Sequence, residues 1–205
     1  IDYLHFHNYL EIGYCNEGNG RMVLGEEEIP YQGGEFTVIP SNYLHTTNSA
    51  PGKLSKWEYL FVDVEKLLGK MAAGSPGRME QMLRAVNSRA ALADSGKYRY
   101  MGELIRTIMD IMRTVEAFCQ EEAEALMTAL LMEIARTNGE GTFGYARNTG
   151  GGGVQRGNLI FRVLDYISDH YSEPLKVGDI AKWAHISETH FRRVLLSYMN
   201  MSPLE

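Results

Sequence analysis

Two histidines and a glutamate near the start of this 205-residue chain are spaced so that they could form one site. His5, His7 and Glu11 lie at odd-numbered positions, so in an extended strand their side chains project from the same face. The opposite face would be apolar and could pack against the rest of the domain. It carries Phe6, Leu10, Ile12 and Tyr14.

His45 adds a third imidazole to this group, because it follows a second strand-like segment that ends at Pro40. Three imidazoles and one carboxylate suit a divalent transition metal with open coordination positions, so His5, His7, Glu11 and His45 are candidate metal ligands. The same side chains could instead line an effector pocket without metal, or bond to one another. Aromatic rings that could stack on an effector are Tyr9, Trp57 and Tyr59, although each of them could equally be ordinary core.

The spacing His-x-His-x3-Glu-x6-Gly, which ends at Gly18, resembles the first motif of the cupin proteins. The segment GGEFTVIPSNYLH resembles their second motif, except that Asn42 stands where that motif has glycine. Asparagine tolerates a positive φ, so the turn can be kept. The resemblance implies a cupin-like β-barrel or jelly roll, for which we assign residues 1–70 as the sensor domain.

Helical periodicity replaces the strand pattern further along the chain. Apolar stripes over residues 98–116 and 120–137 predict an antiparallel helix pair, which we expect to end at Thr137-Asn138-Gly139. Each stripe could be core, a dimer interface, or both. We assign 71–138 as a helical dimerisation segment and 139–157, with four consecutive glycines at 150–153, as a linker.

Residues 158–205 predict three short helices, the last of which begins after Ser187, a good N-cap residue. The segment LKVGDIAKWAHISETHFRRVLLSYMNMSPLE resembles the opening half of the AraC/XylS-type DNA-binding domain. The resemblance implies a helix-turn-helix with Ala181 at the helix crossing and a turn at 184–186. It assigns DNA contacts to Ser187 and to the base-facing residues Thr189, Arg192 and Arg193.

Two features reduce the expected DNA affinity of the chain. The family commonly has Phe-Lys-Lys late in the second helix, whereas this chain has Leu195-Leu196-Ser197, and Asn200 replaces a usual glycine. Residues 202–205 look like the start of a helix that joins two helix-turn-helix units, and the second unit is absent. We therefore expect weak operator binding, because phosphate neutralisation supplies much of the affinity.

Composition narrows the class of protein without identifying it. The net charge is −6, divided as −5 over residues 1–70, −1 over 71–153 and 0 over 154–205, so no basic patch marks a nucleic-acid binder. The two cysteines lie far apart, which favours reduced thiols in the cytoplasm over a disulfide framework. The sequence shows neither a signal peptide nor a membrane-spanning run, so we expect no membrane partner.

Together these patterns predict a mixed fold, β-rich and then α-helical, in a bacterial, ligand-responsive transcription regulator. It would bind a small effector, a sugar or similar polar metabolite, in its barrel and DNA through its helix-turn-helix, as a homodimer. We expect no enzymatic activity and no required cofactor, with a metal in the barrel left open. The alternatives are a metal-dependent cupin isomerase or dioxygenase with a helical tail, and a dimeric interaction module.

Overall fold

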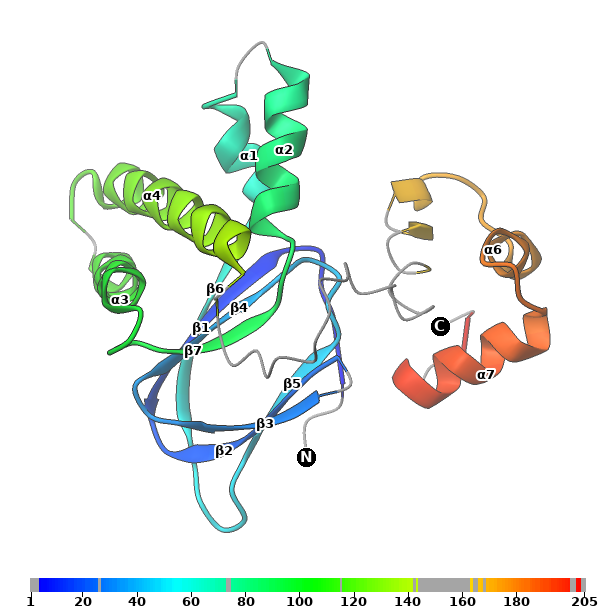
Figure 1. The fold of residues 1–205 in the computed structure, drawn as a ribbon, viewed down its shortest axis with the longest axis horizontal. Coiled ribbons are helices and arrows are strands. Elements are labelled where there is room, and N and C mark those ends of the chain that lie inside the picture. The colour runs from blue at the N-terminus through cyan, green and yellow to red at the C-terminus, as the bar shows by residue number, and fades with distance from the viewer. Residues whose placement is uncertain are drawn as a thin grey trace.

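The β-rich part of the chain forms two antiparallel sheets in the computed structural model (Figure 1). The structure describes residues 4–25, 27–72, 75–114, 116–141, 143, 163, 166–167, 169–199 and 202–203. The four-stranded sheet has the order β6-β1-β4-β7 and the three-stranded sheet the order β3-β2-β5. Their strands are β1 (Leu10–Glu17), β2 (Asn19–Leu24), β3 (Glu27–Gln32), β4 (Glu35–Ile39), β5 (His45–Ser49), β6 (Lys56–Val62) and β7 (Ala91–Asp94).

Strand alternation in β1 separates two environments. Leu10, Ile12 and Tyr14 join the apolar core that also contains the helices, whereas Cys15 joins a second core between the sheets. β1 pairs with β4 through Glu11 opposite Ile39, and with β6 through Glu11 opposite Phe61. Glu11 is therefore on the inner face of the sheet, as its spacing predicts.

The expectation of a β-rich region followed by helices is confirmed, but the described strands do not close into a barrel. They remain two separate sheets with edge strands β6 and β7 on one and β3 and β5 on the other. The sheet also extends beyond residue 70, because β7 pairs with β4 (Ala93 opposite Phe36). Its short apolar run, Ala91-Leu92-Ala93, lies between helical segments and gives little periodicity to detect.

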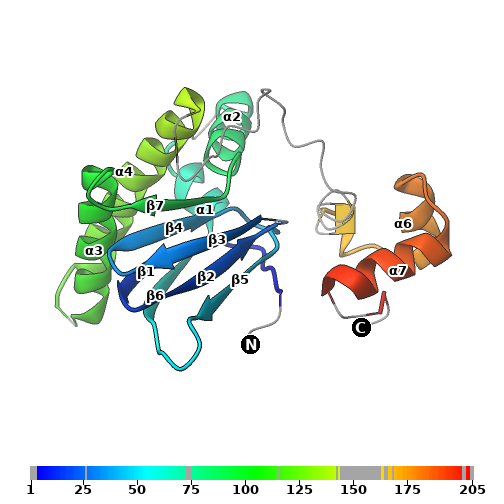
Figure 2. The same ribbon diagram turned by 60° about the horizontal axis from the view of Figure 1, so that its bottom comes forward.

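Four helices cover the outer face of the four-stranded sheet (Figures 1 and 2). They are α1 (Val64–Gly69), α2 (Pro76–Val86), α3 (Arg99–Arg113) and α4 (Cys119–Glu140). The stripe predicted for α3 is buried at Met101, Leu104, Ile105 and Ile108, but Met112 is 56% exposed. None of the helices in the described part of the chain is long and apolar enough to cross a bilayer.

The α4 helix continues slightly past the predicted stop at 137–139. It ends at Glu140, where Gly141 takes the left-handed conformation (φ 70°) as the C-cap. Asn138 stays helical, and its side-chain amide donates to the carbonyls of Ala85 and Val86 at the end of α2. A tertiary contact thus replaces the capping role expected of this asparagine.

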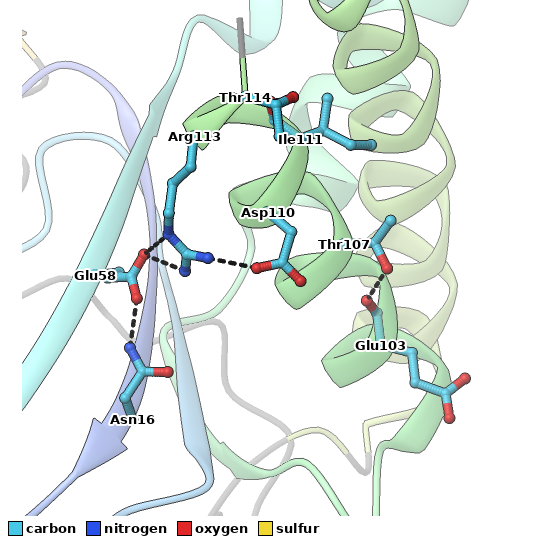
Figure 3. A network of polar contacts seen from close by, with 8 residues as sticks. All are labelled: Asn16, Glu58, Glu103, Thr107, Asp110, Ile111, Arg113 and Thr114. Carbon is cyan, nitrogen blue, oxygen red and sulfur yellow. Dashed lines mark hydrogen bonds and ion pairs between the residues drawn. The ribbon is translucent and has the colours of Figure 1, made fainter. Parts of the chain in front are cut away.

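A polar network on the surface joins the β6 edge to α3 (Figure 3). Arg113 donates to Glu58 Oε2 through Nη2 at 2.6 Å and through Nε at 3.1 Å, and it also pairs with Asp110. The Asn16 amide donates to the other Glu58 oxygen at 2.6 Å. The bond from Arg113 lowers the pKa of the Glu58 carboxyl.

Two further helices are described near the C-terminus, α6 (Val177–Trp183) and α7 (Glu188–Met199). Ile180, Ala181, Ala184, Phe191 and Leu195 form their shared core. The first of the three helices expected over 158–205 and the glycine-rich linker at 139–157 lie mostly outside the described residues.

Candidate functional site

The histidine and glutamate side chains meet where the N-terminal segment runs beside β5. His5 and His45 form an isolated antiparallel bridge, in which each backbone nitrogen donates to the other carbonyl at 3.0 Å. Glu11 is the second residue of β1 and lies across from them on the inner face of the sheet. Backbone pairing therefore holds the two segments in register and sets the positions of the side chains.

Glu11 is the centre of the group. Its Oε2 atom lies 2.9 Å from His7 Nε2 and 3.3 Å from His45 Nε2. Ligand atoms of His5, Glu11 and His45 lie within 4.8 Å of one another. All four residues predicted from spacing are thus brought together, and Glu11 and His45 are only 4% and 2% exposed.

Backbone carbonyls fix the tautomers of two of these imidazoles. His7 Nδ1 lies 2.9 Å from the Tyr9 carbonyl, and His45 Nδ1 lies 2.7 Å from the Tyr43 carbonyl. A carbonyl oxygen can only accept, so Nδ1 must carry the proton in both rings. Each Nε2 atom is left to face Glu11.

The cluster shifts the acidity of its members in opposite directions. Burial raises the pKa of Glu11, but hydrogen bonds and charge interactions with His45 and His7 outweigh it and hold that pKa at about 2. The hydrogen bond to Glu11 raises the pKa of His7, against the effect of burial. Glu11 is therefore a carboxylate throughout the physiological range, ready to face a cation or a hydroxyl donor.

Aromatic rings extend the site along the inner face of β6. Phe61 meets the His7 ring edge-on at 5.0 Å, and Tyr59 stacks on Trp57 with the ring centroids 5.8 Å apart and an interplanar angle of 9°. A Cβ atom at Gly13 would lie 2.9 Å from the Tyr59 ring, so glycine there leaves room for that ring against β1. Burial also raises the pKa of Tyr59 to about 12.

Trp57, a predicted effector residue, is partly buried and packs against the core that contains Cys15. Its indole Nε1 is buried and has no hydrogen-bond acceptor among the described groups. Sequence reasoning did not select Phe61, although its period-two spacing from Trp57 and Tyr59 was visible.

Tyr9 does not join the other predicted effector residues. It lies in a bend before β1 and is 43% exposed, so the strand alternation that would have turned it inward does not apply. Tyr9 lines a different cavity, of about 410 Å³, together with Asn42 and Asp63. Asn42 itself adopts φ 58°, as its place in the second motif predicts.

The C-terminal helices have the geometry of a helix-turn-helix. Ala181 is 1% exposed at the crossing of α6 and α7, and His185 turns the chain with φ 58°. Ser187 Oγ accepts from the His190 backbone nitrogen at 3.2 Å, which confirms Ser187 as the cap of α7. The turn leaves one face of α7 without a packing partner among the described residues of this unit.

The three base-facing residues predicted on α7 lie on this open face. Thr189, Arg192 and Arg193 are all exposed. Arg193 donates to His190 Nδ1 at 2.9 Å, and Arg192 lies 3.9 Å from Glu188. Exposed arginines held only by weak local partners are suited to bind an external anionic surface.

The N-terminal segment that carries the histidines also contacts the C-terminal unit. Leu44 is 1% exposed and belongs to the same apolar cluster as Ile180 and Phe191. Leu4 and Phe6 pack against this cluster. The residues that flank the three histidines thus join the core of the helix-turn-helix.

A two-sheet domain with an internal polar cluster, followed by a helix-turn-helix, defines a class of ligand-binding, DNA-binding proteins. The family model of the AraC-like ligand binding domain matches residues 2–131. The family model of bacterial regulatory helix-turn-helix proteins, AraC family, matches residues 167–205. The chain therefore belongs to the AraC family. Both models describe regulators, which favours regulation over the cupin-enzyme alternative.

The chain is also similar to several known proteins. The uncharacterised HTH-type transcriptional regulator YfiF of Bacillus subtilis (strain 168) is 26% identical over 206 residues, which cover 97% of this chain and 61% of YfiF. The AraC-like transcriptional activator CuxR is 14% identical with a TM-score of 0.45, covering 92% of this chain and 61% of CuxR. ToxT from Vibrio cholerae is 12% identical with a TM-score of 0.47, covering 98% of this chain and 91% of ToxT. The chain spans about three fifths of the length of the first two relatives.

Proposed function

We propose that this chain is the sensor and first DNA-contacting part of a cytoplasmic, ligand-responsive transcription regulator. A small effector binds between the two sheets, and α7 contacts DNA in the major groove. The observation that carries the proposal is the position of the N-terminal segment, which has histidines beside Glu11 and apolar neighbours in the helix-turn-helix core.

The effector site combines polar groups that face one another with aromatic surface. A carboxylate, three imidazoles and an unpartnered indole N–H offer acceptors and donors to hydroxyl groups, while Tyr59 and Phe61 offer flat apolar faces. This combination favours a carbohydrate-like, polyhydroxylated effector. Sugars present hydroxyls around the ring edge and C–H groups on its faces, so they use both kinds of contact.

A physical route joins the two regions. His5 and His7 alternate with Leu4 and Phe6, so a ligand that repositions the imidazoles also moves the apolar side chains. These apolar side chains pack on the C-terminal cluster. The stability of that cluster therefore differs between the positions that the N-terminal segment takes with and without the ligand. Coupling of this kind requires the effector to bind the two arrangements with different affinity.

Dimerisation through the helical segment completes the proposal. The pocket between β6, α1, α3 and α4 has a volume of about 440 Å³ and is lined mainly by apolar side chains, including the exposed Met112. Phe118 is 78% exposed in the turn between α3 and α4. A second copy that covers this surface would make a homodimer and present two α7 helices to DNA.

The test joins effector binding to DNA binding. A panel of aldoses, alditols and sugar acids is screened for a rise in the thermal unfolding midpoint, and active compounds are added to complexes with duplexes selected from a randomised library. We expect an active compound to change DNA affinity, measured by fluorescence anisotropy. Replacing Trp57 with Phe should weaken the effector response, whereas Trp183→Phe on α6 serves as the matched control. Stabilising compounds that leave DNA affinity unchanged would contradict the proposal.

A further inference from the structure

A second cavity, outside the cluster of histidines around Glu11, is lined mainly by polar side chains. It has a volume of about 410 Å³ and lies where the start of β1, the start of α1, the end of α2 and Asp169 meet. None of the four members of the histidine and glutamate cluster lines it. Its size suits a small organic molecule, because ligand cavities in proteins measure roughly 300–1,000 Å³.

The charged residues of this cavity all have the same sign. Asp63, Glu65 and Asp169 line it, and no lysine, arginine or histidine is among the described residues that do so. Asp63 Oδ1 accepts from the Lys66 backbone nitrogen at 2.9 Å and caps α1, so its second oxygen remains for a ligand. Within the described part of the chain, Glu65 and Asp169 form neither a hydrogen bond nor an ion pair. The start of α1 accounts for acids at 63 and 65, whereas Asp169 comes from a separate part of the chain.

The uncharged part of the lining also favours a positive ligand. Leu83 and the C-cap residue Asn87 line the cavity at the C-terminal end of α2, where the helix carries a partial negative charge. Tyr9, which is 43% exposed, contributes an aromatic ring, and such rings attract cations. The side-chain amides of Asn8 and Asn42 add carbonyl oxygens that can accept from an ammonium group.

The three carboxylates are too far apart to share one metal ion. Among the described residues, only His5, Glu11 and His45 bring three ligand atoms within 4.8 Å of one another. The cavity lining also includes the apolar side chains of Leu10 and Val62, which suit methylene groups. Separated carboxylates with an apolar stretch match an elongated cation that has an ammonium group at each end. We propose that this cavity binds a small aliphatic diamine.

A bound diamine would connect two regions of the molecule. One ammonium group pairs with Asp169, which precedes α6, and the other pairs with Asp63 and Glu65 at the start of α1. The ligand therefore stabilises the arrangement in which the C-terminal region lies against the sensor, because only that arrangement completes the site. The inference goes beyond the proposed function, since this site is separate from the effector site between the sheets and supplies a second signal.

The experiment titrates the untagged chain with putrescine by isothermal calorimetry, at about 0.15 M salt so that diffuse attraction to the acidic chain is screened. We expect one putrescine per chain and no binding of the butanediol of the same length, which lacks the two charges. Asp169→Asn and Glu65→Gln should each weaken binding about tenfold, because hydrogen bonds between charged groups are stronger than those between neutral ones. Glu173→Gln and Glu80→Gln are the matched controls, since each removes one exposed carboxylate outside the cavity.

Two further variants locate the ligand, with circular dichroism to show that each is folded. Asn8→Lys places an ammonium group at the cavity without removing a carboxylate and should abolish putrescine binding, whereas Glu11→Gln should leave it unchanged. Loss of binding in Glu11→Gln would place the diamine in the histidine cluster and overturn the inference. Absence of putrescine binding, equal binding of the diol, or equal weakening by the cavity and control variants would overturn it too. The response to polyols is measured separately, so these results would leave the proposed function standing.

Discussion

The sensor site and the DNA-contacting face are built in opposite ways. In the sensor, residues separated by up to forty positions converge on one buried carboxylate, Glu11, so every contact depends on how the sheets fold. On α7, Thr189, Arg192 and Arg193 lie within one helical turn or so and project outward, so a local helix is sufficient. The first site is set by tertiary structure and the second by secondary structure, which predicts different responses to substitution.

The largest effect is expected from Phe191→Ala. Phe191 is 1% exposed at the centre of the C-terminal cluster, and truncation of a buried phenylalanine costs about 3–5 kcal/mol. This cost should unfold the small helix-turn-helix while the sheets stay folded. Because the two tryptophans lie one in each region, fluorescence of single-tryptophan variants that retain Trp57 or Trp183 reports each separately. Simultaneous loss of both signals would show that the regions do not unfold independently.

Glu11→Gln should destabilise the sensor by about 2 kcal/mol in chelator at pH 7, since hydrogen bonds to charged groups contribute about 1.5–3 kcal/mol. The depressed pKa of Glu11, at about 2, means that its contribution is present above the usual carboxyl pKa and lost as the pH falls through about 2. The raised pKa of His7 adds stability below about pH 6.5, which is lost as the pH rises through the raised value. The penalty measured by chemical denaturation should therefore be greatest near pH 5. If the loss of stability in Glu11→Gln did not change with pH, the shape of the Glu11 side chain would matter and its charge would not.

Arg192→Ala should weaken binding to a selected duplex by about tenfold, because a bidentate contact to guanine contributes about 1–3 kcal/mol. The thermal midpoint should not change, since Arg192 is exposed and only loosely paired to Glu188. Arg78→Ala, on α2, is the control for the loss of one positive charge. If the two substitutions weakened DNA binding equally, Arg192 would contribute only nonspecific electrostatic attraction to DNA.

The smallest effect is expected from Glu58→Gln. Glu58 accepts from Arg113 and Asn16 at the surface (Figure 3), and surface ion pairs contribute little because water screens them. We expect no resolvable change in the thermal midpoint. A clear loss of stability would show that the β6 edge depends on this network, and would sharpen the contrast with the buried carboxylate of Glu11.

Sequence reasoning succeeded where periodicity is local. The face of β1 that carries Glu11 and the cap at Ser187 follow from neighbouring residues. The positive φ of Asn42 and the DNA-facing side of α7 were instead implied by the resemblance to known families. The convergence of His45 on Glu11 was predicted because the spacing of both motifs marks the strands that bring them together.

It failed where contacts between distant segments decide the structure. Tyr9 turns outward because β1 begins at Leu10, and Asn138 stays helical because it bonds to α2. The position of β7 depends on its pairing with β4, which no local pattern shows. The roles of Leu4, Phe6 and Leu44 could not be read from hydrophobicity alone, because the surface they cover belongs to a separate region.

The central claim is that a ligand sensed between the sheets acts on the DNA-binding helices through the N-terminal segment. Hydrogen–deuterium exchange of the chain, with and without a stabilising polyol from the panel, tests it most directly. We predict changed exchange over residues 4–11 and 44–49 and also over α6 and α7, with the distant change lost in Phe6→Ser. Protection confined to the sheets, with α6 and α7 unchanged in the wild-type chain, would contradict the account.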